Sequence, residues 1–434
     1  MITRKIGPAL AAGCTVVAKS PGETPFTAAA LAELAHRAGI PAGVVNVITA
    51  LDNTAEVGET LTSSSVVRKV SFTGSTRVGQ LLMKQSAATL KKLSFELGGN
   101  APFIVFDDAD VDAAVAGAIA CKFRSSGQTC VCANRIFVQN GIYDDFAAKF
   151  ADKVRGFTVG YGYDEGVTHG PLIHDRAVGK VVEHVEDAKR QGAKVVVGGQ
   201  KMPELGANFF QPTVLTGMKP GMKLHGEETF GPVAGLFPFD TEAEVVEMAN
   251  RAEVGLAGYF FSRDLKRVYR VAEALEVGMC AVNTGILSDP ATPFGGVKMS
   301  GFGREGSMYG VDEYVLPSLA LPTSSLYHSA PAGSRAARYD ADLVPQVSGM
   351  QDCHPGWHVG APPGLVRRRG LCPCALLLHD ESRSWPVQFS ELMMPIPLTS
   401  HSYYLLNPIN DDGRMSSFSV CRFRHKCISL ASDA

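Results

Sequence analysis

Two residues of this chain carry side chains that can do covalent chemistry, and both lie beside glycine. Cys130 follows Gly127, and Glu96 precedes the pair Gly98 and Gly99. A thiolate attacks carbonyl carbon, a carboxylate accepts protons, and glycine lets the backbone move or approach a substrate closely. Buried structural cysteines and solvated glutamates are the commoner state of both residue types. The pair therefore predicts a cysteine nucleophile with a mobile general base, if the surrounding elements bring them together.

Composition limits the kinds of partner. The chain has 434 residues, of which 45% are hydrophobic and 19% charged, with a net charge of -2. These values predict a globular protein with two sizeable cores that acts on small molecules, and they argue against nucleic acid or a membrane as partner. The N-terminus resembles neither a secretory signal nor a transit peptide, and the ten cysteines lack the spacing of a disulfide framework. We expect free thiols and a cytoplasmic protein.

Residues 1–98 alternate apolar strands with amphipathic helices. Strands are predicted at 15–19, 44–48 and 66–72, and a helix begins at Pro25 with Thr24 as its cap and ends at Gly39. This alternation is typical of β-α-β units and a parallel sheet. A second α/β domain is predicted over 99–299, with a helix at 111–123 that leads to Cys130 and another at 143–155.

The last 120 residues differ in character. Periodicity disappears after Tyr314, and the chain becomes rich in Pro, Ser and Gly. We predict a mostly disordered tail over 315–434. This tail contains four residues of the types that bind zinc, namely Cys372, Cys374, His354 and His358. Because the sequence around them is irregular, we expect no metal site there.

A turn after the third strand is suited to bind phosphate. Thr73-Gly74-Ser75-Thr76-Arg77-Val78-Gly79 connects this strand to a helix. Backbone amides and the positive end of the helix dipole can face a pyrophosphate there. The turn is not the G-x-G-x-x-G fingerprint, so spacing alone leaves an ordinary βα turn equally acceptable.

From Met1 to about Tyr314 the sequence resembles the aldehyde dehydrogenase superfamily, and within it the succinate-semialdehyde dehydrogenases. The resemblance rests on the Glu96 and Cys130 segments, the Gly74 turn, the run Glu227 to Pro232, and the run Pro293 to Gly306. It implies an α/β fold with a partial Rossmann-like cofactor domain (1–98), a catalytic domain (99–299) and a return to the cofactor domain (300–314). It also implies NAD(P)-dependent oxidation of succinic semialdehyde to succinate, in 4-aminobutyrate catabolism, through a thiohemiacetal and a thioester on Cys130.

The resemblance assigns the cofactor residues. The implied cofactor-binding positions are Lys19, Gly22, Gly74, Ser75, Gly79, Glu228 and Phe230. Lys19 and Glu228 would hold the two riboses. Gly22 stands where members that prefer NAD carry a glutamate, which removes repulsion against a 2′-phosphate. Glu23 next to it could restore a preference for NAD. We therefore expect NADP or NAD, with NADP slightly favoured.

The resemblance also assigns a substrate clasp. Arg4 and Arg124 match an arginine pair that holds the distal carboxylate of the semialdehyde, and Ser288 matches a third contact. Paired guanidinium groups favour an aldehyde with a terminal carboxylate. Glutaric semialdehyde is the competing substrate. Cys132 is a candidate redox partner for Cys130, with a small core-filling thiol as the equal alternative.

The ends of the chain depart from the family pattern. Family members carry, just before the position of Met1, a stretch whose asparagine donates to the oxyanion, and loss of such a donor costs about 10²-fold to 10³-fold in turnover. They also close with a strand that pairs subunits, where Pro317 interrupts the pattern here. The family is homo-oligomeric, but the assembly strands are expected to be missing. An inactive relative that binds only nucleotide or subunits is the alternative function, and a mitochondrial location is the alternative compartment.

Overall fold

The computed structural model describes residues 1–319, 402–406, 418–422 and 426–430. Residues 1–315 and 424–434 form one compact unit, and residues 316–423 form a second. In the second unit, three strands pair antiparallel in the order β15-β17-β16. Their bounds are Ser318–Leu319 (β15), Ser402–Leu406 (β16) and Phe418–Arg422 (β17).

The first sheet of the main unit has six strands in the order β14-β4-β3-β18-β1-β2. Their bounds are Gly301–Phe302 (β14), Lys92–Glu96 (β4), Lys69–Thr73 (β3), Lys426–Leu430 (β18), Thr15–Lys19 (β1) and Val45–Ile48 (β2). All neighbours are parallel except β14 and β4. The helices of this region are Ile2–Ala11 (α1), Pro25–Arg37 (α2), Thr54–Ser63 (α3), Thr76–Ser86 (α4) and Tyr309–Asp312 (α11).

The second sheet has seven strands in the order β12-β11-β5-β6-β9-β8-β7, parallel except for β7 and β8. Their bounds are Met279–Val282 (β12), Ala257–Phe261 (β11), Ala101–Val105 (β5), Ala133–Gln139 (β6), Val233–Phe239 (β9), Thr213–Thr216 (β8) and Lys194–Val197 (β7). Its helices are Val111–Phe123 (α5), Tyr143–Arg155 (α6), Asp175–Arg190 (α7), Lys223–Gly226 (α8), Glu242–Asn250 (α9) and Leu265–Ala274 (α10). A short ladder joins Val254–Gly255 (β10) to Val297–Lys298 (β13).

The second sheet is covered by apolar side chains on both faces. One core cluster contains Phe103, Ile136 and Phe150, and the other contains Ile104, Phe137 and Val181. Neighbouring residues of β5 therefore point to opposite cores, as the period of two in a strand requires. Such double burial explains why the strands of this sheet are continuous apolar runs.

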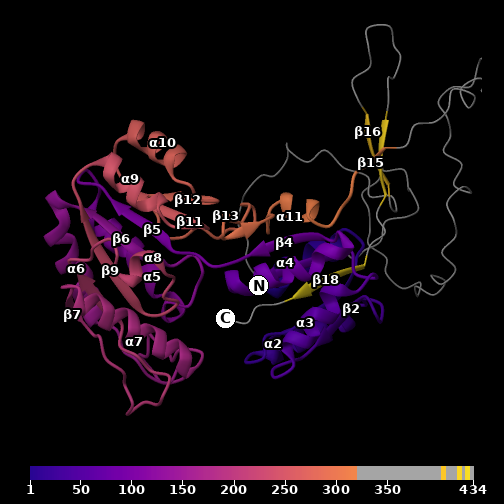
Figure 1. The fold of residues 1–434 in the computed structure, drawn as a ribbon, viewed down its shortest axis with the longest axis horizontal. Coiled ribbons are helices and arrows are strands. Elements are labelled where there is room, and N and C mark those ends of the chain that lie inside the picture. The colour runs from indigo at the N-terminus through magenta and orange to yellow at the C-terminus, as the bar shows by residue number, and fades with distance from the viewer. Residues whose placement is uncertain (320–401, 407–417, 423–425, 431–434) are drawn as a thin grey trace, which may run out of the picture. The chain divides into compact units, whose positions relative to one another are not determined.

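The tail contributes a strand to the first sheet. β18 lies between β3 and β1 and pairs parallel with both, as its yellow arrow among indigo elements shows (Figure 1). The tail predicted to be mostly disordered thus contains three five-residue strands, β16, β17 and β18. Lys426-Cys427-Ile428-Ser429-Leu430 has two adjacent apolar residues, Cys427 and Ile428, so it lacks strict period-two alternation and does not stand out in a Pro- and Gly-rich tail.

The sequence predicted the first residue of α2 correctly and its capping residue only in part. The helix begins at Pro25 as predicted, and Gly39 follows it with a φ of +85°. Thr24 occupies the capping position, but its side chain makes no capping hydrogen bond. The fixed φ of Pro25 therefore starts this helix without help from the threonine hydroxyl.

Candidate active site

The predicted base lies at the carboxyl end of a central strand. Glu96 is the last residue of β4 and is buried, and β4 continues into Gly98 and Gly99. Ser300 holds this segment, since its carbonyl accepts from Leu97 N at 2.9 Å and its hydroxyl donates to Gly98 O at 2.6 Å. The carboxylate atom Oε2 of Glu96 has no hydrogen-bond partner among the described residues. Glu96 is thus held on its backbone while its side chain stays available.

Burial determines the protonation of Glu96. Loss of hydration and, after it, the nearby Glu305 raise the pKa of its carboxyl to about 9, although Lys5, Arg304 and Arg4 oppose the rise. Lys5 is fully buried on α1 and forms an ion pair with Glu305. Sequence reasoning did not identify this pair. The available signal was a lysine on the apolar face of a helix that begins the chain.

The predicted nucleophile lies beside the same glycines. Cys130 is half-buried and follows α5 and the short 3-10 helix Arg124–Gly127. A Cβ atom on Gly99 would lie 2.1 Å from Cys130 O, so only glycine allows the two segments to approach this closely. Burial, Glu228 and Glu96 together raise the pKa of the Cys130 thiol to about 12. The structure therefore brings Cys130 and Glu96 into one site.

A second carboxylate joins the cluster of Glu96 and Cys130. Glu228 Oε1 accepts a hydrogen bond from Gly99 N at 3.1 Å, and burial raises its pKa to about 7. Phe230, two residues later, has a φ of +52°, which is strained for a residue with a side chain. Glu228 thus reaches the glycines that separate Glu96 from Cys130.

The predicted phosphate turn adjoins the base. Gly74 N donates to Glu96 O at 3.0 Å, and Ser75 caps α4 by accepting from Val78 N. A Cβ atom on Gly79 would meet Leu97 at 2.5 Å, so this glycine lets α4 pack against the chain after β4. Lys19 is buried at the carboxyl end of β1, two strands from β3.

Buried polar atoms at this edge of the first sheet fit a dinucleotide. Ser20 Oγ and Thr73 Oγ1 are buried without a hydrogen-bond partner among the described residues, and both stand where parallel strands end. Ligands of doubly wound sheets bind outside the carboxyl ends of the strands. A Cβ atom on Gly22 would lie 2.5 Å from the exposed Leu51, so a larger residue there would have to displace that side chain.

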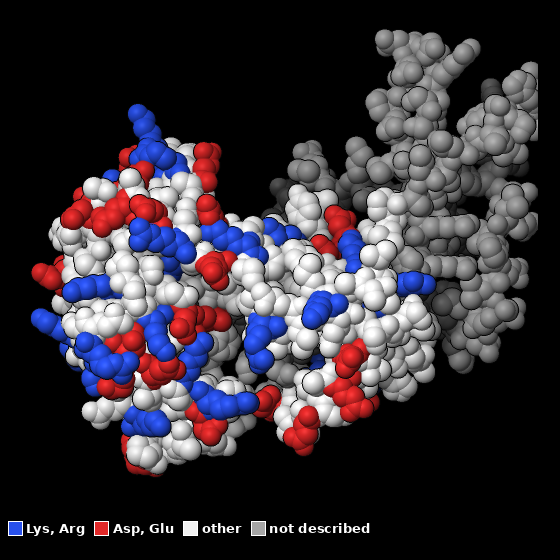
Figure 2. Space-filling view, viewed as in Figure 1, with Lys and Arg blue, Asp and Glu red and all other residues white. Residues whose placement is uncertain are grey.

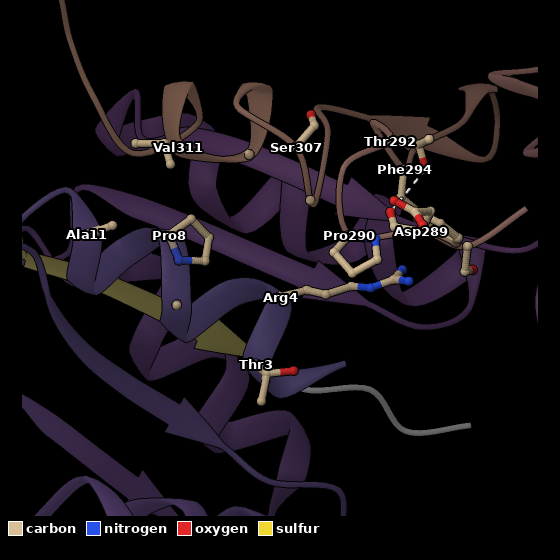
Figure 3. A pocket seen from close by; sticks show the side chains of 14 residues that line it. Thr3, Arg4, Pro8, Ala11, Asp289, Pro290, Thr292, Phe294, Ser307 and Val311 are labelled. Atoms are coloured by element: carbon tan, nitrogen blue, oxygen red, sulfur yellow. Dashed lines mark hydrogen bonds between the residues drawn. The ribbon is translucent and has the colours of Figure 1, made fainter. Parts of the chain in front are cut away.

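A cavity of about 540 Å³ is lined by two of the three residues predicted to bind the substrate. Arg4 and Ser288 both line it, and Figure 3 shows Arg4 extending from α1 toward Phe294 and Asp289. The Arg4 guanidinium carbon lies 4.2 Å from the centre of the Phe294 ring. Arg124 is exposed and is not among the described residues that line this cavity. The structure therefore joins Arg4 with Ser288 but not with Arg124.

The remaining predictions concern cysteines, metals and surface charge. All five cysteines within residues 1–319 are free, and Cys132 is buried. No group of three potential metal ligands occurs among the described residues, and Cys372, Cys374, His354 and His358 lie outside them. On the face drawn in Figure 2, Lys and Arg are interspersed with Asp and Glu, without an extended patch of one sign. No helix in the described part of the chain has the length and apolarity to cross a bilayer.

Comparison with known proteins identifies the family. The model of the aldehyde dehydrogenase family matches residues 1–318. This chain belongs to the aldehyde dehydrogenase family. It is 60% identical over 324 residues to succinate-semialdehyde dehydrogenase [NADP(+)] 1 of Schizosaccharomyces pombe, covering 74% of this chain and 65% of the relative. It is 58% identical to a glutarate-semialdehyde dehydrogenase of Pseudomonas putida, covering 73% and 65%.

A solved structure agrees with the fold of this aldehyde dehydrogenase. An NADP-dependent enzyme of Escherichia coli superposes with a TM-score of 0.71 at 59% identity, over 72% of this chain and 64% of that one. The predicted family and its α/β fold are confirmed. The chain spans 65% of the length of both curated relatives, so the reaction is argued below from its own residues.

Proposed function

We propose that this chain catalyses NAD(P)-dependent oxidation of succinic semialdehyde to succinate. The observation that carries the proposal is the meeting of Cys130, Glu96 and Glu228 around Gly98 and Gly99. A thiol, a buried carboxyl of raised pKa and a ribose-binding carboxylate are the groups that this oxidation requires. The names of the two relatives, which act on succinate semialdehyde and glutarate semialdehyde, support the same class of substrate.

The reaction proceeds on Cys130. Its sulfur attacks the aldehyde carbon to form a thiohemiacetal, and loss of hydride from that carbon leaves a thioester. NAD(P)+, when bound, supplies the acceptor of the hydride. Glu96 then removes a proton from water, which hydrolyses the thioester and releases the acid with the free thiol. The residues proposed to hold the cofactor are Lys19, Gly74, Ser75, Gly79, Glu228 and Phe230. Gly22 has no carboxylate that would repel the 2′-phosphate of NADP.

Arg4 is the proposed anchor for the distal carboxylate. It lines the cavity with Ser288, and stacking against Phe294 limits the directions in which its guanidinium can point. Arg124 stays a proposed second contact. Glutaric semialdehyde is the second candidate because the relative named for it is 58% identical to this chain.

The test is to incubate the purified full chain with NADP+ or NAD+ and each aldehyde, and to follow the absorbance of the reduced nicotinamide. We expect turnover of succinic and glutaric semialdehydes and little turnover of neutral butanal. Arg4→Met should raise KM for the semialdehydes more than for butanal, whereas Arg37→Met, on an exposed face of α2, should change neither. Absence of both reduced cofactor and a thioester on Cys130 would leave the nucleotide- or subunit-binding alternative.

Compartment and assembly are proposed separately from the reaction. We keep the cytoplasm as the proposed location, with mitochondria as the alternative, and we propose that assembly is weaker than in the homo-oligomeric family. Light scattering of the purified chain measures its mass in solution. A stable tetramer or dimer would contradict the proposed weakness of assembly.

A further inference from the structure

The loop before Cys130 adopts a backbone that needs outside support. Ser125, Ser126 and Gly127 have consecutive φ values of +54°, +54° and +75°. Residues with side chains seldom adopt this left-handed region, and such strain persists only where the surroundings hold it. A Cβ atom on Gly127 would lie 2.1 Å from Gly231 O, so the loop also presses against the chain that follows Glu228.

Gln128 supplies this support through both ends of its side-chain amide. Its Nε2 donates to Ser125 O at 3.2 Å and to Pro171 O at 3.4 Å. Its Oε1 accepts from Ile173 N at 2.8 Å. Close by, Ser126 Oγ donates to Gly170 O at 3.0 Å. The strained turn is thereby tied to residues 170–173, which lead into α7.

The same helix also contacts the Glu228 segment. His184 of α7 is fully buried, and its Nδ1 lies 3.1 Å from Thr229 Oγ1. A Cβ atom on Gly231 would lie 2.4 Å from a methyl group of Val181. α7 and its lead-in therefore contact both the loop that carries the nucleophile and the loop that carries Glu228.

We propose that Gln128 is a positioning residue, which ties the Cys130 loop to residues 170–173 so that α7 sets the place of the thiol relative to Glu228. Gln128 takes no part in bond making. It acts by holding Ser125, Ser126 and Gly127 in their left-handed turn, shortly before Cys130. This inference rests on the proposed function for its effect on turnover, but not for its effect on the loop.

The first experiment measures the loop without turnover. Gln128→Ala removes all three side-chain hydrogen bonds, and Gln128→Glu removes the two donors but keeps the acceptor for Ile173 N. Each variant is treated with iodoacetamide, and peptide mass spectrometry gives the alkylation rate of Cys130 divided by that of the exposed Cys280. We expect this ratio to rise about fivefold or more in Gln128→Ala and less in Gln128→Glu, because the alanine variant loses more of the hydrogen bonds that hold the turn.

The second experiment separates positioning from general stability. In Gln128→Ala, kcat should fall about 10-fold to 100-fold because a small displacement of a reacting group has that cost, while KM and the melting temperature change little. Gln139→Ala is the matched control, since Gln139 likewise bonds backbone groups through both ends of its amide, at Asp107 and Asp240. An unchanged alkylation ratio in Gln128→Ala would overturn the inference, even if turnover falls. Inactive wild-type protein would instead count against the proposed function, and the ratio would still decide the role of Gln128.

Discussion

The two parallel sheets differ in how the chain supplies their strands. The strands of the second sheet all come from Ala101 to Val282, in one continuous stretch. The first sheet is built from residues 15–96 and 301–302, but its inner position between β3 and β1 is taken by β18, from residues 426–430. The proposed nucleophile Cys130 thus lies in a region with a self-contained sheet, and the proposed base Glu96 ends a strand of a sheet that depends on a distant segment.

The largest expected effect is on the nucleophile. Cys130→Ala removes the sulfur on which both intermediates form, and we expect turnover to fall about 10⁴-fold or more with little change in stability. Steady-state kinetics and thermal melting measure the two quantities. Cys280→Ala, on the exposed edge strand β12, is the matched control and should keep full activity. Substantial activity in Cys130→Ala would assign the covalent step to another residue.

The next effect concerns the base in the first sheet. Glu96→Gln should lower turnover about 10²-fold to 10⁴-fold, because water then lacks its proton acceptor. Glu96 accepts a proton only when ionised, and its pKa is raised to about 9 by burial. Wild-type activity should therefore increase with pH up to about 9, and this increase should be absent in the residual activity of Glu96→Gln. The same pH profile in both proteins would show that another group is titrating.

The buried side chain of Arg135 stabilises the second sheet and can be replaced. Arg135 is almost completely buried on β6 and donates to Asn100 O, Met248 O and Ala249 O at 2.9, 3.1 and 3.0 Å. Arg135→Leu leaves three buried carbonyls unpaired, and we expect a loss of about 3 kcal/mol in the free energy of unfolding. Urea unfolding measures it. Arg155→Leu on the surface of α6 should cost less than about 0.5 kcal/mol. Equal losses in the two variants would refute this role for Arg135.

The smallest of these effects tests the distant strand. Ile428→Pro removes a backbone donor from the middle of β18, and proline is excluded from inner strands, so we expect a loss of about 2 kcal/mol. Hydrogen exchange should show faster opening of β1 and β3 but unchanged protection of β5 and β6. Ile428→Val keeps the backbone donor and serves as control. If β1 and β3 keep their protection in Ile428→Pro, another segment fills the inner position.

Local sequence patterns predicted the elements that depend on neighbouring residues. The helices Val111–Phe123 and Tyr143–Arg155 lie where their apolar periodicity placed them, and the strand at 15–19 was also predicted with its bounds. Glu96 and Cys130 were selected because both lie near glycines, and the resemblance to the family supplied their proposed roles.

Long-range pairings could not be read in the same way. Nothing within Lys426–Leu430 indicates that its neighbours are β1 and β3, since a five-residue segment of this composition fits many sheets. Likewise, the sequence indicates only that Gln128 is a polar loop residue, and the structure is needed to show that residues 170–173 lie beside it. The Lys5 and Glu305 pair was missed for the same reason, because the partners are far apart in sequence.

The position of β18 has a consequence for biosynthesis. A ribosome makes β1 and β3 long before β18, so the emerging chain carries two strands whose facing edges have no partner until residues 426–430 are made. Parallel pairing over such a sequence distance is slow, and unpaired edges promote association with other chains. Closure of the first sheet must therefore wait for residues 426–430, and protection of those edges by a chaperone would govern the yield of native protein.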